Sequence, residues 1–280
     1  MTGQSPAGKL ATAAALAPLL RDGMTLGIGG FGLDRKPMAL LREVVRAGPR
    51  DLAVETYAGG LDIELLLAAG SLAQVHACHV GLDHFGLAPL FRAARQSGAI
   101  AFEEWSEWTQ LAAWRAAAEG VEWGVVRLDP GTDLLRVNPK LRSVTSPFGG
   151  AEAVAVAAPR IDLALLHAEA VHPEGWAIAE GDPYMDEILA RAAGTVVVSA
   201  ERIIGDAELE ARHRDVHLLA SYVDLVIPAP MGALPGSCLP DYMIDLASVR
   251  AYLEAAAGTG EPAALMEALL RDLPPMGAMQ

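Results

Sequence analysis

Acidic side chains gather in one short segment of the sequence, between residues 102 and 108. The segment holds Glu103, Glu104 and Glu107 beside Trp105 and Trp108. If it is helical, Glu107 lies four residues after Glu103 and three after Glu104, so the carboxylates crowd one another beside apolar rings. Like charges and apolar neighbours raise the pKa of a carboxyl group into the range that suits proton transfer or nucleophilic attack. The alternative is a solvated row of acids on a helix whose tryptophans are buried.

Glycines form a second feature, directly after the apolar run at residues 24–28. Gly29, Gly30 and Gly32 surround Phe31, and Arg35 follows. Without a Cβ the main chain can approach a ligand closely, and free N–H groups of such a loop can point at an oxyanion or phosphate. The pattern predicts an exposed loop that binds substrate. An ordinary turn between a strand and a helix is the alternative.

The histidines and cysteines favour structural roles over metal binding. His76 and His79 are three residues apart on an expected strand and therefore point to opposite faces, and no further ligand spacing completes a site with His84. We expect no bound metal. His167, at the end of an expected strand, fits either a core histidine or a catalytic one. Cys78 fits a buried, unreactive thiol.

Composition and charge limit the classes of function. The 280-residue chain carries a formal charge of −14, and nucleic-acid binding relies on Lys and Arg that neutralise phosphates, so we expect no nucleic-acid partner. Two cysteines are too few for a disulfide framework. No apolar run reaches the about 18 residues of a membrane span. The Ala/Leu-rich run at residues 10–20 fits a first helix better than a secretory signal, so we expect a cytoplasmic protein without a membrane partner.

Apolar strand-like runs alternate with Ala/Leu-rich stretches, which is the pattern of an α/β sheet with helices on its faces. We expect strands at residues 25–28, 52–56, 74–80, 121–126, 153–157, 163–168, 195–199 and 225–228. We expect helices at residues 36–47, 63–69, 88–96, 104–119, 183–193 and 249–257, a solvated helix around residues 210–217, and a surface excursion at residues 129–148. No repeat or low-complexity linker divides the chain, so residues 1–280 are expected to form a single domain.

Several short motifs follow one another along the chain. They begin with Asp22-Gly23, Gly29-Gly30-Phe31 and Pro37. They continue with Tyr57-Ala58-Gly59-Gly60, Ser97-Gly98-Ala99-Ile100, Ser143 to Phe148, Asp162 with His167-Ala168, Val196 to Ile203, and Pro230 to Pro235 followed by Asp241-Tyr242. This ordered set resembles family I coenzyme A transferases, and in particular their alpha subunits. The ending Arg35-Lys36-Pro37 is closer to the glutaconate-type branch than to the short-chain 3-oxoacid branch.

The resemblance implies a fold, a substrate and a partner. The fold is an open, mostly parallel, doubly wound sheet with helices on both faces. The substrate is a coenzyme A thioester, with no bound cofactor. A homologous beta subunit supplies the glutamate that attacks the thioester and passes CoA from an acyl-CoA to a carboxylic acid. That glutamate lies between a serine and Asn-Gly in the family, and this chain has no such stretch, so we expect it to be inactive without its partner.

The resemblance also implies a set of substrate-binding residues, namely Gly29, Gly30, Phe31, Gly32, Arg35, Gly59 and Gly60. The loop Gly29-Gly30-Phe31 is expected to donate backbone N–H groups to the thioester oxyanion. Arg35 is expected to pair with a substrate carboxylate through its planar guanidinium. Departures from the family pattern at residues 171–176 and 232–235 leave the acyl group open.

A related branch offers a second reaction. Steroid-ring-opening acyl-CoA hydrolases are built like these transferases but carry an essential glutamate in the segment that matches residues 99–108, and they cleave a carbon–carbon bond of a cyclic 3-oxoacyl-CoA with water. Glu107 is the best match to that glutamate and Glu104 the second, so both are candidate catalytic residues. In a hydrolase Glu107 acts as general base; in a transferase it only shapes the pocket. A module that binds CoA esters without catalysis is the third alternative.

Overall fold

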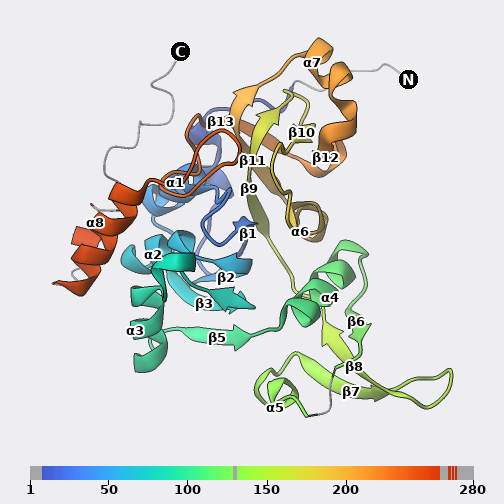
Figure 1. Ribbon diagram of the computed structural model, residues 1–280. Coiled ribbons are helices and arrows are strands. Elements are labelled where there is room, and N and C mark those ends of the chain that lie inside the picture. Colours follow the sequence, from blue (N-terminus) through green and yellow to red (C-terminus); the bar gives the residue numbers. More distant parts are fainter. Residues whose placement is uncertain (1–7, 129–130, 259–263, 266, 268, 270–280) are drawn as a thin grey trace.

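A mostly parallel β-sheet forms the centre of the molecule in the computed structural model, which describes residues 8–128, 131–258, 264, 265, 267 and 269 (Figure 1). Its parallel strands lie side by side in the order β13–β11–β9–β1–β2–β3–β5. Their bounds are β1 Thr25–Phe31, β2 Leu52–Gly59, β3 Leu72–Ala77, β5 Ala101–Glu104, β9 Leu163–Val171, β11 Val196–Ile203 and β13 Leu225–Pro228. The chain runs outward from β1 to β5 and then from β9 to β13 on the other side. The sheet is therefore doubly wound, and the expected α/β fold class is confirmed.

Short strands extend this sheet at its ends. The strand β4, His79–Val80, pairs in parallel with the end of β2. The strand β10, Ala177–Ile178, is antiparallel to β9 and to β12, Val216–Leu218.

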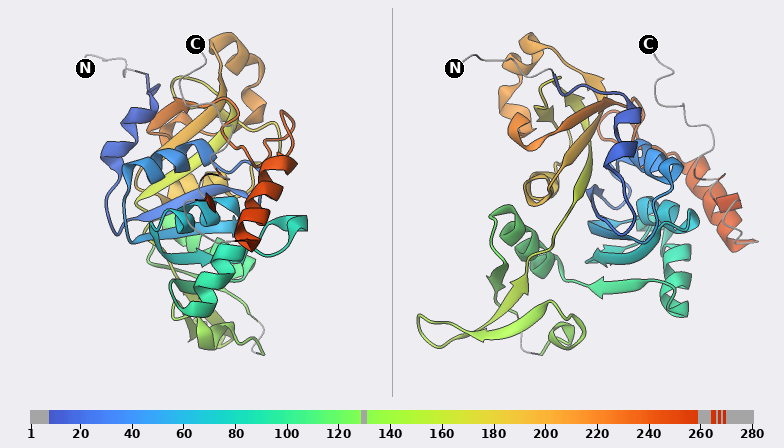
Figure 2. Two further views of the ribbon diagram at one scale, coloured as in Figure 1. Left: turned by 90° about the vertical axis from the view of Figure 1, so that its left-hand side faces the viewer. Right: turned by 180° about the vertical axis from the view of Figure 1, so that it is seen from behind.

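A second, antiparallel sheet lies apart from the first (Figures 1 and 2). It consists of β6 Trp123–Val126, β8 Glu152–Ala157 and β7 Leu141–Thr145, in that order. With the helices α4 Glu107–Ala118 and α5 Leu134–Val137 it makes up what we name the lobe, the part of the chain between β5 and β9.

Helices cover both faces of the parallel sheet (Figure 1). On one face lie α1 Met38–Ala47, α2 Leu61–Ala68 and α3 Pro89–Ser97, with α8 Leu246–Ala257 against α3. On the other face α4 packs against α6 Asp186–Ala192. The helix α7, Asp206–Ala211, follows the end of β11. Within the part of the chain that the structure describes, no helix has the length and apolar character to cross a bilayer.

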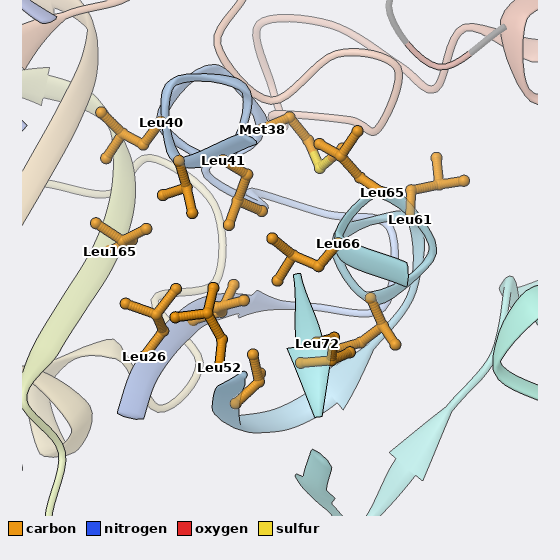
Figure 3. Packing of buried hydrophobic residues seen from close by; sticks show 14 of the residues in the cluster. Leu26, Met38, Leu40, Leu41, Leu52, Leu61, Leu65, Leu66, Leu72 and Leu165 are labelled. Atoms are coloured by element: carbon orange, nitrogen blue, oxygen red, sulfur yellow. The ribbon is translucent and has the colours of Figure 1, made fainter. Parts of the chain in front are cut away.

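Leucines fill the space between the sheet and the first helices (Figure 3). Leu26, Leu52 and Leu72 point up from the strands, and Leu41 and Leu66 point down from α1 and α2; all five are buried. Each such side chain stabilises the fold by about 1.5–3 kcal/mol on burial. This packing holds β1 and β2 in place beneath α1 and α2. The ends of these two strands carry the candidate site.

The first predicted helix is wrong. Residues 10–20 contain two short 3-10 turns, Ala13–Ala15 and Ala17–Leu19, and Leu10 bridges Val226 beside the main sheet. Pro18 cannot donate the N–H that a continuous helix needs. Here tertiary pairing outweighs the helix propensity of alanine and leucine.

Three other segments also differ from the expectation. Residues 101–104 form β5 rather than the start of a helix. The expected excursion contains α5 and β7. The expected solvated helix around residues 210–217 ends at Ala211, and His217 lies on β12. In each case strand pairing, which local sequence does not record, decides the conformation.

Candidate functional site

The carboxyl ends of β1, β2 and β9 meet where the winding of the sheet changes direction. That point lies between β1, which continues outward to β5, and β9, which continues outward to β13. In open α/β sheets the crevice outside the carboxyl ends at this switch point is the usual place for a ligand. The side chains of Phe31, Tyr57 and Glu107 and the buried cluster around Arg35 are found in this region.

The acidic segment is split between two elements. Glu103 and Glu104 belong to β5 and therefore point to opposite faces, whereas Glu107 opens the first turn of α4. The expected crowding of three carboxylates on one helix is wrong. Ser106 explains the boundary, because its side chain accepts from the Thr109 N–H while the Thr109 hydroxyl accepts from the Ser106 N–H.

Glu107 is exposed and faces two groups that hold their protons. Burial and the negative charge of Glu107 raise the pKa of the Tyr57 hydroxyl to about 12. Burial, with Glu107 again contributing, raises the pKa of the Cys78 thiol to about 12, and that thiol donates to the Tyr57 carbonyl at 2.6 Å. The arrangement places one carboxylate beside neutral donors, as general base chemistry requires.

Aromatic rings from separate elements adjoin this carboxylate. Phe31 of β1 stacks on Tyr184 at 5.3 Å between ring centroids and lies 6.2 Å from Tyr57 of β2. Tyr57 in turn lies 6.1 Å from Trp114 of α4. The Tyr184 hydroxyl donates to Asp34 at 2.9 Å, which fixes the orientation of its ring. These rings offer a surface for a flat apolar group.

The glycines at the end of β1 make hydrogen bonds and close contacts within the chain. β1 continues through Phe31, so Gly29 and Gly30 belong to the strand rather than to an exposed loop. Gly30 donates its N–H to Asp186 at 2.9 Å, and Phe31 donates to the Asp34 carbonyl at 2.9 Å. Both N–H groups are thus bonded within the chain, and their donation to an oxyanion stays a prediction. A Cβ at Gly29 would lie 2.5 Å from a carboxylate oxygen of Asp186, which explains the small residue.

The remaining glycines bring two turns together. The Gly32 N–H donates to the Ala58 carbonyl, and the Gly60 N–H donates to Asp62. A Cβ at Gly60 would lie 2.6 Å from the Gly32 carbonyl oxygen, and one at Gly59 would lie 2.7 Å from Ile63. Contact of these glycines with substrate stays a prediction.

Arg35 is fully buried and bound to carboxylates of its own chain. Its guanidinium donates to Asp186 at 2.5 Å and to the His167 carbonyl at 3.2 Å, and it lies 3.6 Å from Glu169. Burial alone would lower the pKa of Arg35, but the charges of Asp186 and Glu169 outweigh burial and raise it. Both terminal nitrogens of Arg35 therefore contact groups of the same chain, and its pairing with a substrate carboxylate stays a prediction. Since Asp186 also accepts from Gly30, the ion cluster joins α6 to the end of β1.

His167 lies within β9 between a hydroxyl and a carboxylate. Its Nδ1 is 2.8 Å from the Ser199 hydroxyl, and its Nε2 is 2.7 Å from Glu201. Ser199 is fully buried, so this Ser-His-Glu row presents no nucleophile to a substrate. Burial would raise the pKa of Glu201, but hydrogen bonds from His167 and Tyr242 lower it. Glu201 also accepts the Gly232 N–H, and the row therefore anchors the loop after β13.

One set of metal-ligating groups emerges from the described residues, made of His167, Glu201 and Cys238. Glu201 is occupied by the hydrogen bonds above, and burial raises the pKa of the Cys238 thiol, so the thiolate form that binds metals is disfavoured. Hydrogen bonds within the chain therefore account for the proximity of these three side chains.

The fold and the site define the class: an α/β enzyme subunit with one exposed carboxylate and an aromatic surface at the switch point of a doubly wound sheet. Residues 9–227 match the family model of coenzyme A transferase, and the chain belongs to this family. Members of the family act on CoA thioesters.

Named relatives narrow the comparison. The chain is 38% identical over 247 residues to the cholesterol ring-cleaving hydrolase IpdA subunit of Mycobacterium tuberculosis, which covers 85% of this chain and 84% of the relative. It is 29% identical over 255 residues to a glutaconate CoA-transferase subunit of Acidaminococcus fermentans, covering 85% and 80%. Both relatives are named as subunits, so the family relationship implies a multi-subunit enzyme.

Solved structures agree with the fold. Glutaconate coenzyme A-transferase from Acidaminococcus fermentans superposes with a TM-score of 0.86 at 27% identity, covering 96% of this chain and 90% of that chain. The decarboxylase AibA/AibB superposes with a TM-score of 0.85 at 30% identity, covering 93% and 97%. One fold thus carries transferase, hydrolase and decarboxylase names.

Proposed function

We propose that this chain is the alpha-type subunit of a hydrolase that opens a ring of a cyclic 3-oxoacyl-CoA, with Glu107 as general base. The observation that carries the proposal is the exposed Glu107 carboxylate beside the protonated Tyr57 and Cys78. The 38% identity to a ring-cleaving hydrolase subunit, compared with 29% to a glutaconate CoA-transferase subunit, supports the same choice.

The reaction assigns a role to each group near Glu107. The carboxylate takes a proton from water, and the hydroxide adds to the ring carbonyl at C3 of the acyl chain. The bond between C2 and C3 then breaks, its electron pair passes to C2 as the enolate of the thioester, and C2 takes up a proton. The product is a ring-opened carboxylate that retains its CoA thioester. The neutral Tyr57 hydroxyl is available to donate to the developing oxyanion.

A partner subunit completes the site in this proposal. Exposed apolar side chains lie next to Glu107 on α4 and around β6, and we name Trp108, Val121, Trp123 and Val125 the tryptophan patch. Trp108 is 54% exposed and Trp123 50%. Large exposed apolar groups that gather on one surface mark an interaction site. A homologous beta subunit that covers the patch would also shield Glu107 and its reacting water from bulk solvent.

CoA transfer is the second candidate. The likeness to a glutaconate CoA-transferase over nearly the whole chain favours it. In a transferase the nucleophilic glutamate comes from the beta subunit, and Glu107 only lines the pocket. The two candidates differ in what happens to the thioester: the hydrolase adds water to the C3 ketone and keeps the CoA thioester, whereas the transferase passes CoA to a second carboxylate.

The test uses the complex of this chain with the partner from the adjacent gene. The complex is incubated with cyclic and linear 3-oxoacyl-CoA esters in ¹⁸O-labelled water, with and without acetate or a dicarboxylate, and the CoA products are followed by mass. The hydrolase predicts gain of one water, with ¹⁸O in the new carboxylate and no need for an acceptor. Acceptor-dependent formation of a new CoA ester would establish the transferase instead. Binding without any turnover would indicate a non-catalytic module.

Glu107→Gln is expected to lower kcat by about 10²–10⁴-fold, which is the usual contribution of a general base. Glu104→Gln tests the second candidate residue, which is also exposed. Glu119→Gln, the same exchange at the exposed end of α4, is the matched control and should leave kcat unchanged. A Glu107→Gln complex with full hydrolase activity would contradict the assignment.

A further inference from the structure

A cavity of about 350 Å³ lies between the parallel sheet and the lobe, away from the candidate active site. Side chains of β2, β3 and β5 line one side, and residues 157–160, where the chain returns from β8 toward β9, line the other. Thr25, the first residue of β1, also lines the cavity, whereas Phe31 at the far end of the same strand lies in the candidate active site. The seven residues of β1 span about 20 Å, so the two places are distinct.

A charged row crosses the sheet at this cavity. Glu55, His76 and Glu103 are register partners on β2, β3 and β5, so their side chains share one face. The Nδ1 of His76 lies 2.9 Å from Glu55 and 3.2 Å from Glu103. Because Nδ1 faces two carboxylates, it must carry a proton. This contact orients the imidazole ring so that Nε2 points away from both carboxylates.

Two buried nitrogens at the cavity have no partner within the described residues. They are Nε2 of His76 and Nε1 of Trp105. Trp105 is only 4% exposed, and both residues line the cavity. A buried N–H without an acceptor costs about 1–3 kcal/mol, so the Trp105 N–H, and His76 Nε2 when the ring is charged, favour an acceptor in this space.

The surrounding charges favour an anion. Burial would lower the pKa of His76, but Glu55 and Glu103 outweigh it and raise the pKa. The charged form carries a second N–H, at Nε2, that points away from the two carboxylates. The other charged groups that line the cavity are Lys140, which precedes β7, and Arg160, which precedes β9; both are exposed. Three basic groups thus face two carboxylates, of which Glu55 accepts the His76 Nδ1 proton, while Glu103 Oε2 lies 3.2 Å from Nδ1 without a hydrogen bond of its own.

Size selects the kind of anion. A cavity of about 350 Å³ falls within the range of about 300–1,000 Å³ that is typical of small-molecule sites. An inorganic ion would leave most of it empty. The apolar lining of Ala157, Ala158 and Pro159 suits a short carbon chain.

We propose that this cavity binds a small organic acid, whose carboxylate accepts hydrogen bonds from His76 Nε2 and Trp105 Nε1 while Lys140 and Arg160 attract it at the entrance. The site is separate from Glu107, so it goes beyond the proposed function and does not depend on it. An acid bound here would contact both the parallel sheet and the lobe.

The test follows the indole N–H signals of the full chain by NMR during titration with butyrate, succinate, inorganic phosphate and neutral butyramide. One indole signal, absent in Trp105→Phe, is expected to shift with butyrate or succinate and not with butyramide. Calorimetry should give a tenfold or greater loss of affinity for the acid in Trp105→Phe. That variant removes an N–H without a protein partner and should therefore remain folded. Binding should weaken as the pH rises above the pKa of His76.

Matched controls separate this site from the active site. Trp123→Phe changes an exposed tryptophan and should bind the acid as the parent chain does. Glu107→Gln should also leave binding unchanged. Equal affinity in Trp105→Phe, an unmoved Trp105 signal with both acids, or a response to phosphate alone would overturn the proposal. Loss of binding in Glu107→Gln would place the acid at the active site instead and overturn it as well.

Discussion

Buried charged residues in this protein mostly neutralise one another. Arg35 stands between Asp186 and Glu169, and all three side chains are removed from water. Replacing one member leaves uncompensated charge in the interior, which typically costs about 3–5 kcal/mol.

Arg35→Met is therefore expected to lower the free energy of unfolding by about 3–5 kcal/mol in urea denaturation. Arg21→Met is the control, because Arg21 is 59% exposed and pairs with Asp162 at the surface, a contact worth about 0–1 kcal/mol. If Arg35→Met were as stable as the parent chain but bound CoA esters weakly, the role in substrate binding predicted from the sequence would stand instead.

His217 makes the stability of the folded chain depend on pH. Its ring is buried on β12, and burial, with the charge of Arg35 as the second cause, lowers its pKa to about 3. Below about pH 6.5 the unfolded chain binds a proton there that the folded chain does not, so stability falls as pH falls toward 3, by up to about 1.4 kcal/mol per pH unit.

His217→Gln should therefore lose about 2 kcal/mol less than the parent chain between pH 7.5 and pH 5 in urea denaturation. His213→Gln, at an exposed histidine nearby, should follow the parent curve. Parallel curves for His217→Gln and the parent would show that the ring titrates normally.

At this scale the sequence locates Glu107 but not its neighbours. The acidic cluster and the resemblance to the hydrolase branch together nominate Glu107, whereas the proximity of Tyr57 and Cys78 depends on how α4 packs on β2. Asp186, Glu169 and Tyr184 were missed because their partners lie far away in sequence; Asp186 is 151 residues from Arg35. Of the neighbours of Glu107, only Tyr57 has a local sign in the sequence, because it stands beside the glycines of the motif Tyr57-Ala58-Gly59-Gly60.

Among the elements, α4 positions the candidate base. Gln110, one turn after Glu107, donates to the carbonyls of Thr56 and His76 at 3.0 and 3.1 Å. Trp114, a further turn along, donates its indole N–H to Glu55 at 2.9 Å. These bonds fix the helix on the face of β2 and β3 and thereby fix the direction of Glu107.

Trp114→Phe should lower the free energy of unfolding by about 1–3 kcal/mol, because the buried Glu55 loses a donor. It should also lower kcat of the complex more than it raises KM, since the helix that carries Glu107 is loosened. Trp123→Phe, at a tryptophan that is exposed in the free chain, is the control for stability, and Glu119→Gln is the control for kcat. Unchanged kcat together with reduced stability would limit Trp114 to a structural role.

The sequence predicts the longer helices and strands, whose apolar pattern extends over many residues, and misses short ones. The strands of the main sheet and α1 are visible as apolar runs and an amphipathic repeat. The strand β5 has four residues and precedes a capped helix, so local sequence merges the two. Its strand conformation arises from pairing with β3, for which the sequence carries no local sign.

On the scale of the whole molecule, the two halves of the sheet and the lobe meet around Glu107. The alternation of strands and helices indicated an α/β sheet, the motif order indicated the family, and the resemblance implied the doubly wound topology; all three are confirmed. The separate antiparallel sheet was not foreseen, because its strands are divided by the expected excursion. We propose that the chain nevertheless unfolds as a single domain, since α4 packs against α6 across the boundary.

Trp108→Glu is expected to weaken assembly with the beta subunit by tenfold or more, because a charge would be buried in the interface. Sedimentation or size-exclusion analysis of the co-expressed complex would measure the loss. Leu87→Glu, at an exposed leucine outside the tryptophan patch, is the control. Normal assembly of the Trp108 variant would place the partner on another surface.

The lobe has a consequence for the history of the family. The chain leaves the parallel sheet after Glu104 and returns to it at Leu163, and this single stretch carries Glu107, whereas Phe31 and Tyr57 remain behind on the sheet. A recombination event with one crossover near each of these two joints would exchange the reactive group and preserve the aromatic surface. Under the proposed role of Glu107, the candidate base and the aromatic surface can be inherited separately, and chimeras built at these joints would test whether the lobe alone decides the reaction.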